Sequence, residues 1–154
     1  MATQKILMPY NFTAYEGKAL DFAINTFAQR EDVKITLFNT YTPLPKIDMK
    51  ASPELNKIRS AMVSLAEELK EMEAGLISAK EHLLENGFSD DQVDYIFKEK
   101  EKSITDEIID TVVKGHYRVL ILSRQAGKVT RFFSRSVHSK VLSVLKDITI
   151  CIAV

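Results

Sequence analysis

Cysteine, long hydrophobic runs and a leader segment are scarce or missing in this sequence, and each absence excludes a class of protein. Cysteine occurs once, at Cys151, so a scaffold built on internal disulfides is excluded. No apolar run approaches the roughly 18 residues that a membrane-spanning helix needs. The first residues lead straight into a short apolar run without a signal-peptide pattern. These absences predict a soluble protein of a reducing compartment, with no membrane partner.

An excess of charge of one sign is also lacking, because 21 basic and 21 acidic residues give a net charge of zero. Residues 53–107 nevertheless carry a net charge of −7, and residues 108–154 carry +6. The basic end contains a cluster within thirteen residues: Lys128, Arg131, Arg135 and Lys140. A solvated positive face and an anion site are both compatible with this cluster. Nucleic acid is not favoured as a partner, because the chain is not basic overall and Phe132 and Phe133 are not interleaved with basic residues.

What the sequence does contain is the composition of one globular domain spanning residues 1–154. Hydrophobic residues make up 45% and charged residues 27% of the chain. Short apolar, β-branched or aromatic runs predict strands at residues 5–9, 33–40, 93–97, 119–123 and 148–154. Helical spacing predicts helices at residues 13–27, 53–85, 104–114 and 134–145. The alternation is typical of the α/β class, with an open five-stranded parallel sheet and helices on both faces.

The second predicted helix is the longest element. Ser52 and Pro53 are a good N-cap and first helical residue, and Gly87 is the expected stop. Its apolar residues follow a spacing of three and four: Leu55, Ile58, Met62, Leu65, Leu69, Met72, Leu76, Ala79 and Leu83. This spacing resembles a coiled-coil seam, but two Met, an Ala and Gly75 weaken it. We therefore favour a helix that packs on the sheet.

In an open parallel sheet, ligands bind beside the loops that follow the strands. The two loops of interest here are residues 9–13 and 123–130, each leading toward a helix N-terminus, where an anion is favoured. Residues 5–13, 119–123, 131–142 and the final apolar run 148–154 resemble the universal stress protein family. The resemblance implies strand order 3-2-1-4-5 in an adenine-nucleotide alpha-hydrolase-like fold, a cytoplasmic location and a homodimer.

Many members of that family bind ATP or AMP through a glycine motif after the fourth strand, and this sequence departs from the motif. Leu122, Gln125 and Arg135 hold the three glycine positions, and Asn11 stands where an Asp is usual. A side chain at those positions hinders the close approach of backbone to phosphate. The candidate site for ATP, AMP or a phosphate-like anion is therefore degenerate: Pro9, Asn11, Thr40, Ser123, Arg124, Gln125, Arg135, Ser136 and Val137.

Three functions remain after other chemistry is weighed. The three His and Cys151 lack metal-ligand spacing or a nucleophile pattern, and Cys151 is interpreted as a small core residue. A stress-response regulatory protein that acts as a homodimer on unknown protein partners is favoured. A weak adenine-nucleotide or anion binder is the alternative, and a slow ATPase has the least support.

The homodimer is predicted through residues 148–154, because this strand has no Lys or Pro to guard an exposed edge. The long second helix is the alternative dimer contact.

Overall fold

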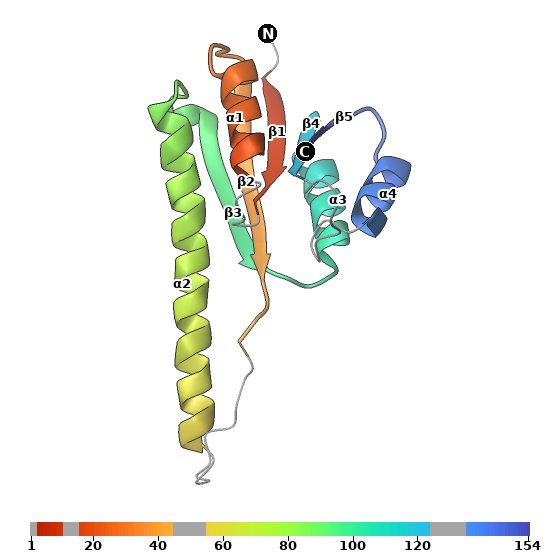
Figure 1. Cartoon of the computed structure of the whole chain (residues 1–154). Helices are drawn as coiled ribbons and strands as arrows, with labels where there is room; N and C mark the ends of the chain where they lie inside the picture. The colour runs from red at the N-terminus through yellow and green to blue at the C-terminus, as the bar shows by residue number, and fades with distance from the viewer. Residues whose placement is uncertain (1–2, 11–15, 45–54, 124–134) are drawn as a thin grey trace.

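The computed structural model describes residues 3–10, 16–44, 55–123 and 135–154. Its centre is a five-stranded, all-parallel sheet in the order β3-β2-β1-β4-β5 (Figure 1). The strands are β1 (Gln4–Pro9), β2 (Val33–Tyr41), β3 (Val93–Glu99), β4 (Val119–Ser123) and β5 (Thr149–Ala153). The predicted fold class and strand order are both confirmed.

Two helices cover each face of the sheet. The helices are α1 (Glu16–Phe27), α2 (Leu55–Glu85), α3 (Ile104–Gly115) and α4 (Arg135–Val144). Buried residues of α1 and α2 form one core with the sheet, and those of α3 and α4 form a second core on the opposite face. The inner strands β1, β2 and β4 are therefore largely buried on both faces, and all five residues of β4 are buried.

Side-chain alternation along β2 decides which residues meet which helices. Ile35 and Leu37 enter the core beneath α1 and α2, whereas Phe38 enters the core beneath α3. Thr36 lies on the side of Phe38, where its hydroxyl accepts a hydrogen bond of 3.0 Å from the buried Tyr117. By the same alternation, Asn39 faces the side of α1 and α2, and Thr40 faces the side of α3.

Only the carboxyl-terminal part of α2 packs on the sheet. Leu76, Ala79 and Leu83 are buried, and they contact the core shared by β2, β3 and α1. The helix ends at Glu85, and Gly87 adopts a positive φ of 113°, as predicted for the stop. The first half of α2 extends past the carboxyl ends of the strands (Figure 1). The predicted packing on the sheet is therefore correct for one half of the helix.

The structure corrects three details of the sequence prediction. β3 runs two residues further, to Glu99. The left-handed residue that ends α3 is His116, with φ 55°, rather than Gly115. Gly115 is instead required by close packing, because a Cβ there would lie 2.3 Å from the ring of Tyr117.

Val144 of α4, predicted to face inward with Val141, is 47% exposed, whereas Val141 is wholly buried. The predicted starts of the first two helices, at Thr13 and at Ser52 and Pro53, lie outside the described residues.

Candidate functional site

The candidate site lies at the carboxyl edge of the sheet, where strand order reverses on either side of β1. The chain adds β2 and β3 on one side of β1 and then places β4 and β5 on the other. Pro9 pairs with Phe38 of β2, and Leu7 pairs with Leu120 of β4. Continuing these registers past the end of β1 brings Thr40 and Ser123 to the same edge as Pro9. Three of the predicted site residues are thus brought together, and all three are buried.

The other predicted site residues belong to segments of which less can be said. Asn11, Arg124 and Gln125 lie outside the described residues. The first turn of α4 contains Arg135, Ser136 and Val137, whose backbone but not side chains the structure describes. These predictions of a phosphate or anion site therefore stay predictions.

Leu122, which the sequence comparison placed at the first glycine position, is a core residue. It lies inside β4, pairs with Ile152 of β5 and is wholly buried. Its side chain packs in the core beneath α3 and α4 and takes no part in a phosphate-binding loop. Ser123 is the residue that ends the strand and begins the loop.

Thr40 does not offer a free backbone donor to this edge. Its N–H group donates a hydrogen bond of 2.8 Å to Oδ1 of the preceding residue, Asn39. Asn39 is only 6% exposed, and its Nδ2 group has no hydrogen-bond partner within the part of the chain that the structure describes. The amide of Asn39 therefore occupies the donor of Thr40 and keeps an unused donor of its own at this edge.

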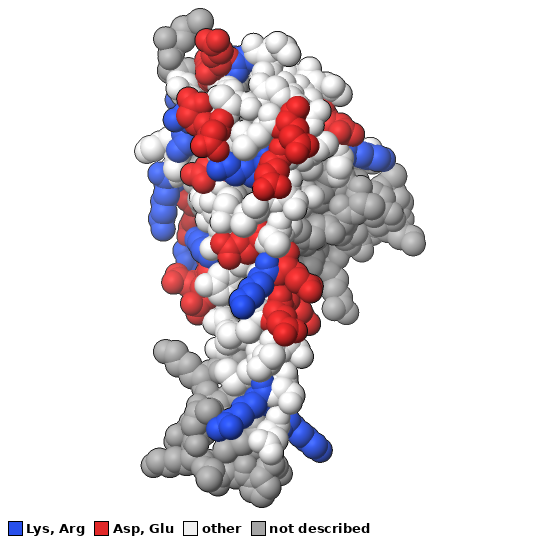
Figure 2. All heavy atoms as spheres, turned by 90° about the vertical axis from the view of Figure 1, so that its left-hand side faces the viewer, with Lys and Arg blue, Asp and Glu red and all other residues white. Residues whose placement is uncertain are grey.

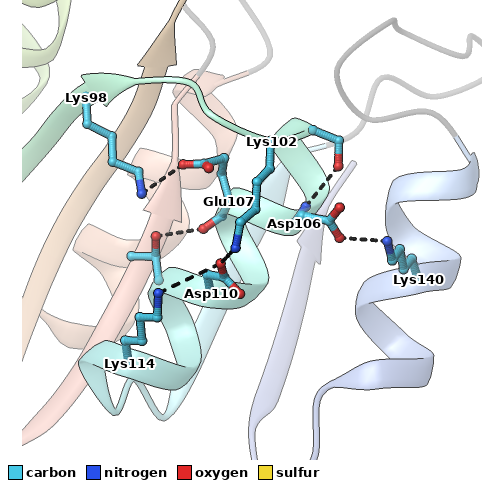
Figure 3. A network of polar contacts seen from close by, with 9 residues as sticks. Lys98, Lys102, Asp106, Glu107, Asp110, Lys114 and Lys140 are labelled. Atoms are coloured by element: carbon cyan, nitrogen blue, oxygen red, sulfur yellow. Dashed lines mark hydrogen bonds and ion pairs between the residues drawn. The ribbon is translucent and has the colours of Figure 1, made fainter.

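On the α3 side of the sheet, the neighbour of Thr40 on β3 pairs with a buried carboxylate. Lys98 is the cross-strand partner of Thr40, and its Nζ atom lies 2.8 Å from Oε2 of Glu107 on α3 (Figure 3). Glu107 is 2% exposed, and Oε2 lacks the alignment of a hydrogen bond, so the contact is an ion pair. A carboxylate withdrawn from water needs such a partner. The pair joins the end of β3 to the first turns of α3.

Further ion pairs surround this one on the exposed side of α3. Lys140 of α4 bonds to Asp106 at 2.6 Å, and Lys102 pairs with Asp110 (Figure 3). The hydrogen bonds from Lys140 and Ser103 lower the pKa of Asp106, and that from Lys102 lowers the pKa of Asp110. Together these contacts tie α3 to α4 and to the segment that follows β3.

The sequence analysis missed both Asn39 and Glu107. Glu107 follows Ile104 by three residues, a spacing that places it on the apolar face of the helix, among the buried Ile108 and Val112. An acidic residue within an apolar stripe is the signal that could have revealed it. Asn39 gave no comparable signal, because a polar residue near the end of a strand is ordinary.

Among the described residues, no group of three or more His, Cys, Asp and Glu side chains could hold a metal ion. None of the described helices is both long and apolar enough to cross a membrane. Cys151 is partly buried on β5, and this burial raises the pKa of its thiol.

Comparison with known proteins gives a consistent result. The model of the universal stress protein family matches residues 2–146. The universal stress protein UspA from Lactobacillus plantarum is 14% identical with a TM-score of 0.63, and the match covers 100% of this chain and 99% of that one. A universal stress protein from Archaeoglobus fulgidus in complex with dAMP is 14% identical with a TM-score of 0.61, covering 99% of this chain and 98% of that one. A universal stress protein in complex with cAMP is 14% identical with a TM-score of 0.61, covering 99% and 97%. No curated protein matches significantly.

Proposed function

Because the chain belongs to the universal stress protein family, we propose that it acts as a homodimeric regulatory protein that binds nucleotide only weakly. The resemblance of the sequence to this family implies a cytoplasmic dimer and a response to stress. The observation that carries the proposal is the open edge of β5. A second candidate function, the binding of an adenine nucleotide, is favoured by the similar structures that contain dAMP and cAMP.

The outer edge of β5 has the features of a pairing surface. Thr149 N donates to Arg118 O at 3.0 Å, so the N–H and C=O groups of Ile150 and Ile152 point away from β4. The strand contains no Lys or Pro, and its register with β4 runs through all five residues without a bulge. Ile152 is 40% exposed beside this edge. Soluble proteins seldom leave such an edge unpaired.

A two-fold axis through Cys151 would use the whole edge. In this antiparallel register, Ile150 of each chain exchanges hydrogen bonds with the partner's Ile152. Cys151 then lies opposite the partner's Cys151 as a non-hydrogen-bonded pair, with Cα atoms about 4.5 Å apart. This separation is within the range that a disulfide can span. Cys151 therefore provides a direct readout of the proposed dimer.

The first prediction is that, in about 1 M NaCl, where contacts between exposed charges are screened, Ile152→Pro separates the dimer into monomers. Proline removes an N–H that points away from the sheet, at a position where an edge strand tolerates it. Ile152→Thr keeps the donor and the strand propensity, and it is the matched control. In sedimentation experiments at micromolar concentration in the same salt, we expect dimers of the wild type and Ile152→Thr. Mild oxidation should link these dimers through Cys151. A monomeric wild type, or a dimer that never cross-links, would contradict the proposal.

Weak nucleotide binding is supported by the state of Thr40. The resemblance to the family implies that the position of Thr40 offers its backbone to adenine in nucleotide-binding members, whereas here the N–H is already bonded to Asn39. A hydrogen bond is worth about 1 kcal/mol when a free donor is available. Together with the missing glycines, this predicts a dissociation constant for ATP on the order of 0.1 mM or weaker.

The second prediction tests this explanation by freeing the donor. Asn39→Val removes the acceptor that occupies Thr40 N–H, so ATP should bind about fivefold more tightly. Asn39→Asp keeps an acceptor and is the control, for which no gain is expected. Calorimetric titration with ATP and magnesium measures both. Low-micromolar affinity of the wild type would contradict weak binding, whereas an unchanged affinity of Asn39→Val would show that Thr40 does not limit it.

A further inference from the structure

Most of the first half of α2 projects past the sheet, and only near Leu69 and Lys70 does it adjoin the ends of β2 and β3. At 1.5 Å per residue, the 31 residues of α2 extend over about 46 Å, whereas the nine residues of β2 extend over about 30 Å. The buried positions of α2 begin at Leu76. Figure 1 shows residues at the start of α2 lying beyond the carboxyl ends of β2 and β3.

An apolar stripe continues along this projecting half. Its members keep the alternating spacing of four and three: Ile58, Met62, Leu65, Leu69 and Met72. Leu65 is 40% exposed, and the other four are half-buried. In the same register, Leu76 and Ala79 occupy the next two positions of the seam and are buried against the sheet. A spacing of this kind fits a second helix by the packing of knobs into holes.

The charges along the projecting half favour a second copy in the antiparallel direction. Residues 56–63 carry Lys57 and Arg59 and no acidic side chain, a net charge of +2. Residues 64–72 carry three Glu and one Lys, a net charge of −2. Figure 2 shows basic side chains toward the lower end of this helix and acidic ones above them. An antiparallel partner sets each basic part against an acidic part, whereas a parallel partner sets like against like.

We propose that residues 56–72 of α2 pair with the same residues of a second copy in an antiparallel coiled coil. The register that centres this pairing places Met62 beside Leu65 of the second copy, and Ile58 beside its Leu69. Only the projecting halves overlap, so the two folded bodies lie at opposite ends of the pair. The surface is independent of β5, because α2 packs beside β3 at the other edge of the sheet.

The seam is tested in the Ile152→Pro chain, which lacks the proposed β5 contact. In about 50 mM NaCl, where charges are little screened, we expect this chain to dimerise in sedimentation experiments. Leu65→Asp should weaken that association about tenfold or more, because it places a charge in the seam. Val63→Asp is the matched control: Val63 is 59% exposed, two residues away and outside the stripe, so association should persist. A monomeric Ile152→Pro chain, or equal effects of the two Asp variants, would overturn the proposal.

The direction is tested by reversing charge on each part separately, also in the Ile152→Pro chain. Lys57→Glu with Arg59→Glu makes both parts acidic, and Glu67→Lys with Glu68→Lys makes both parts basic. Each variant alone should associate about tenfold more weakly. An equimolar mixture of the two should recover the affinity of the parent, since opposite charges then meet again. Circular dichroism confirms that the helices are intact, and failure of the mixture to recover would overturn the antiparallel arrangement.

The experiments distinguish a wrong proposal for the β5 contact from a wrong proposal for the α2 contact. If β5 is not an interface, Ile152→Pro leaves the association of the wild type unchanged while Leu65→Asp abolishes it. If α2 is not an interface, Leu65→Asp leaves the association of the wild type unchanged while Ile152→Pro abolishes it.

Discussion

At the scale of single residues, the most informative group is the carboxylate of Glu107. This carboxylate is buried between α3 and the sheet. It forms an ion pair with the ammonium group of Lys98, a partly exposed residue near the end of β3. Burying a charged pair seldom adds stability in itself, but removing one partner leaves the other uncompensated. The consequences of removing Lys98 and of removing Glu107 should therefore differ, because Glu107 is buried and Lys98 is partly exposed.

The next prediction concerns the different losses of stability expected on removing Lys98 and on removing Glu107. Lys98→Met leaves a buried carboxylate unpaired and should lower the free energy of unfolding by about 1–3 kcal/mol at pH 7. Glu107→Gln leaves only a partly exposed ammonium group and should cost less. Lys100→Met, two residues along the same segment, is the control and should stay within about 0.5 kcal/mol of the wild type. Urea unfolding measures all three, and an equal loss for Lys98→Met and Lys100→Met would contradict the role of the pair.

At the scale of helices and strands, the sequence predicted correctly the features that follow from the local spacing of apolar and polar residues. β4 was predicted with its observed bounds, since Val119 to Ser123 is a continuous apolar run that ends in a polar residue. The buried face of α1 was also correct, including Leu20, Ala23 and Phe27. These features follow from periodicity, which a sequence displays directly.

Features that depend on contacts between distant elements were not predictable. The end of α3 was misplaced by one residue because Gly115 is set by the ring of Tyr117 rather than by a left-handed turn. Val144 has the spacing of a core residue, yet α4 ends there and leaves it exposed. The length of the sheet beneath α2 cannot be read from the helix alone, so the projecting half was not foreseen.

The same distinction holds for the candidate site. Pro9, Thr40 and Ser123 were predicted together because parallel strands present their carboxyl ends at one edge. The bond from Thr40 N–H to Asn39 was not predictable, because Asn side chains have several alternative backbone partners near a strand end. Sequence reasoning therefore placed these three residues at one edge of the sheet, but it did not reveal that the N–H of Thr40 is occupied.

At the scale of the whole molecule, the two proposed contacts lie at opposite edges of one sheet. β5 forms one edge, and β3 with α2 forms the other. Each contact is a two-fold that uses the same surface on both chains, so each one alone gives a dimer. A chain that makes both contacts assembles beyond the dimer. The concentration of protein and salt would then set the size of the assembly, because the α2 contact depends on charge.

Acid stability is the last prediction, and it belongs to the whole molecule because the relevant carboxylates are dispersed over it. Hydrogen bonds lower the pKa of Asp32 beside Arg30, of Asp91 beside Ser89, of Asp106 beside Lys140 and of Asp110 beside Lys102. A carboxyl whose pKa is lower in the folded state adds stability above its unfolded pKa of about 3.9. That stability is lost as the pH falls through the folded pKa. Because Asp91 is exposed and the other three are partly exposed, each contribution is small and screened by salt.

We therefore expect the urea midpoint to be nearly constant between about pH 5 and 7 and to fall progressively below about pH 4. The fall should be shallower in the variant that combines Asp106→Asn with Asp110→Asn, since two of the titrating bonds are then absent at every pH. Asp94→Asn is the control, because Asp94 is exposed on β3, accepts a bond of 2.8 Å from the N–H of the adjacent Tyr95, and is in no ion pair among the described residues. A combined variant that loses stability as steeply as the wild type would show that these two carboxylates do not carry the acid sensitivity.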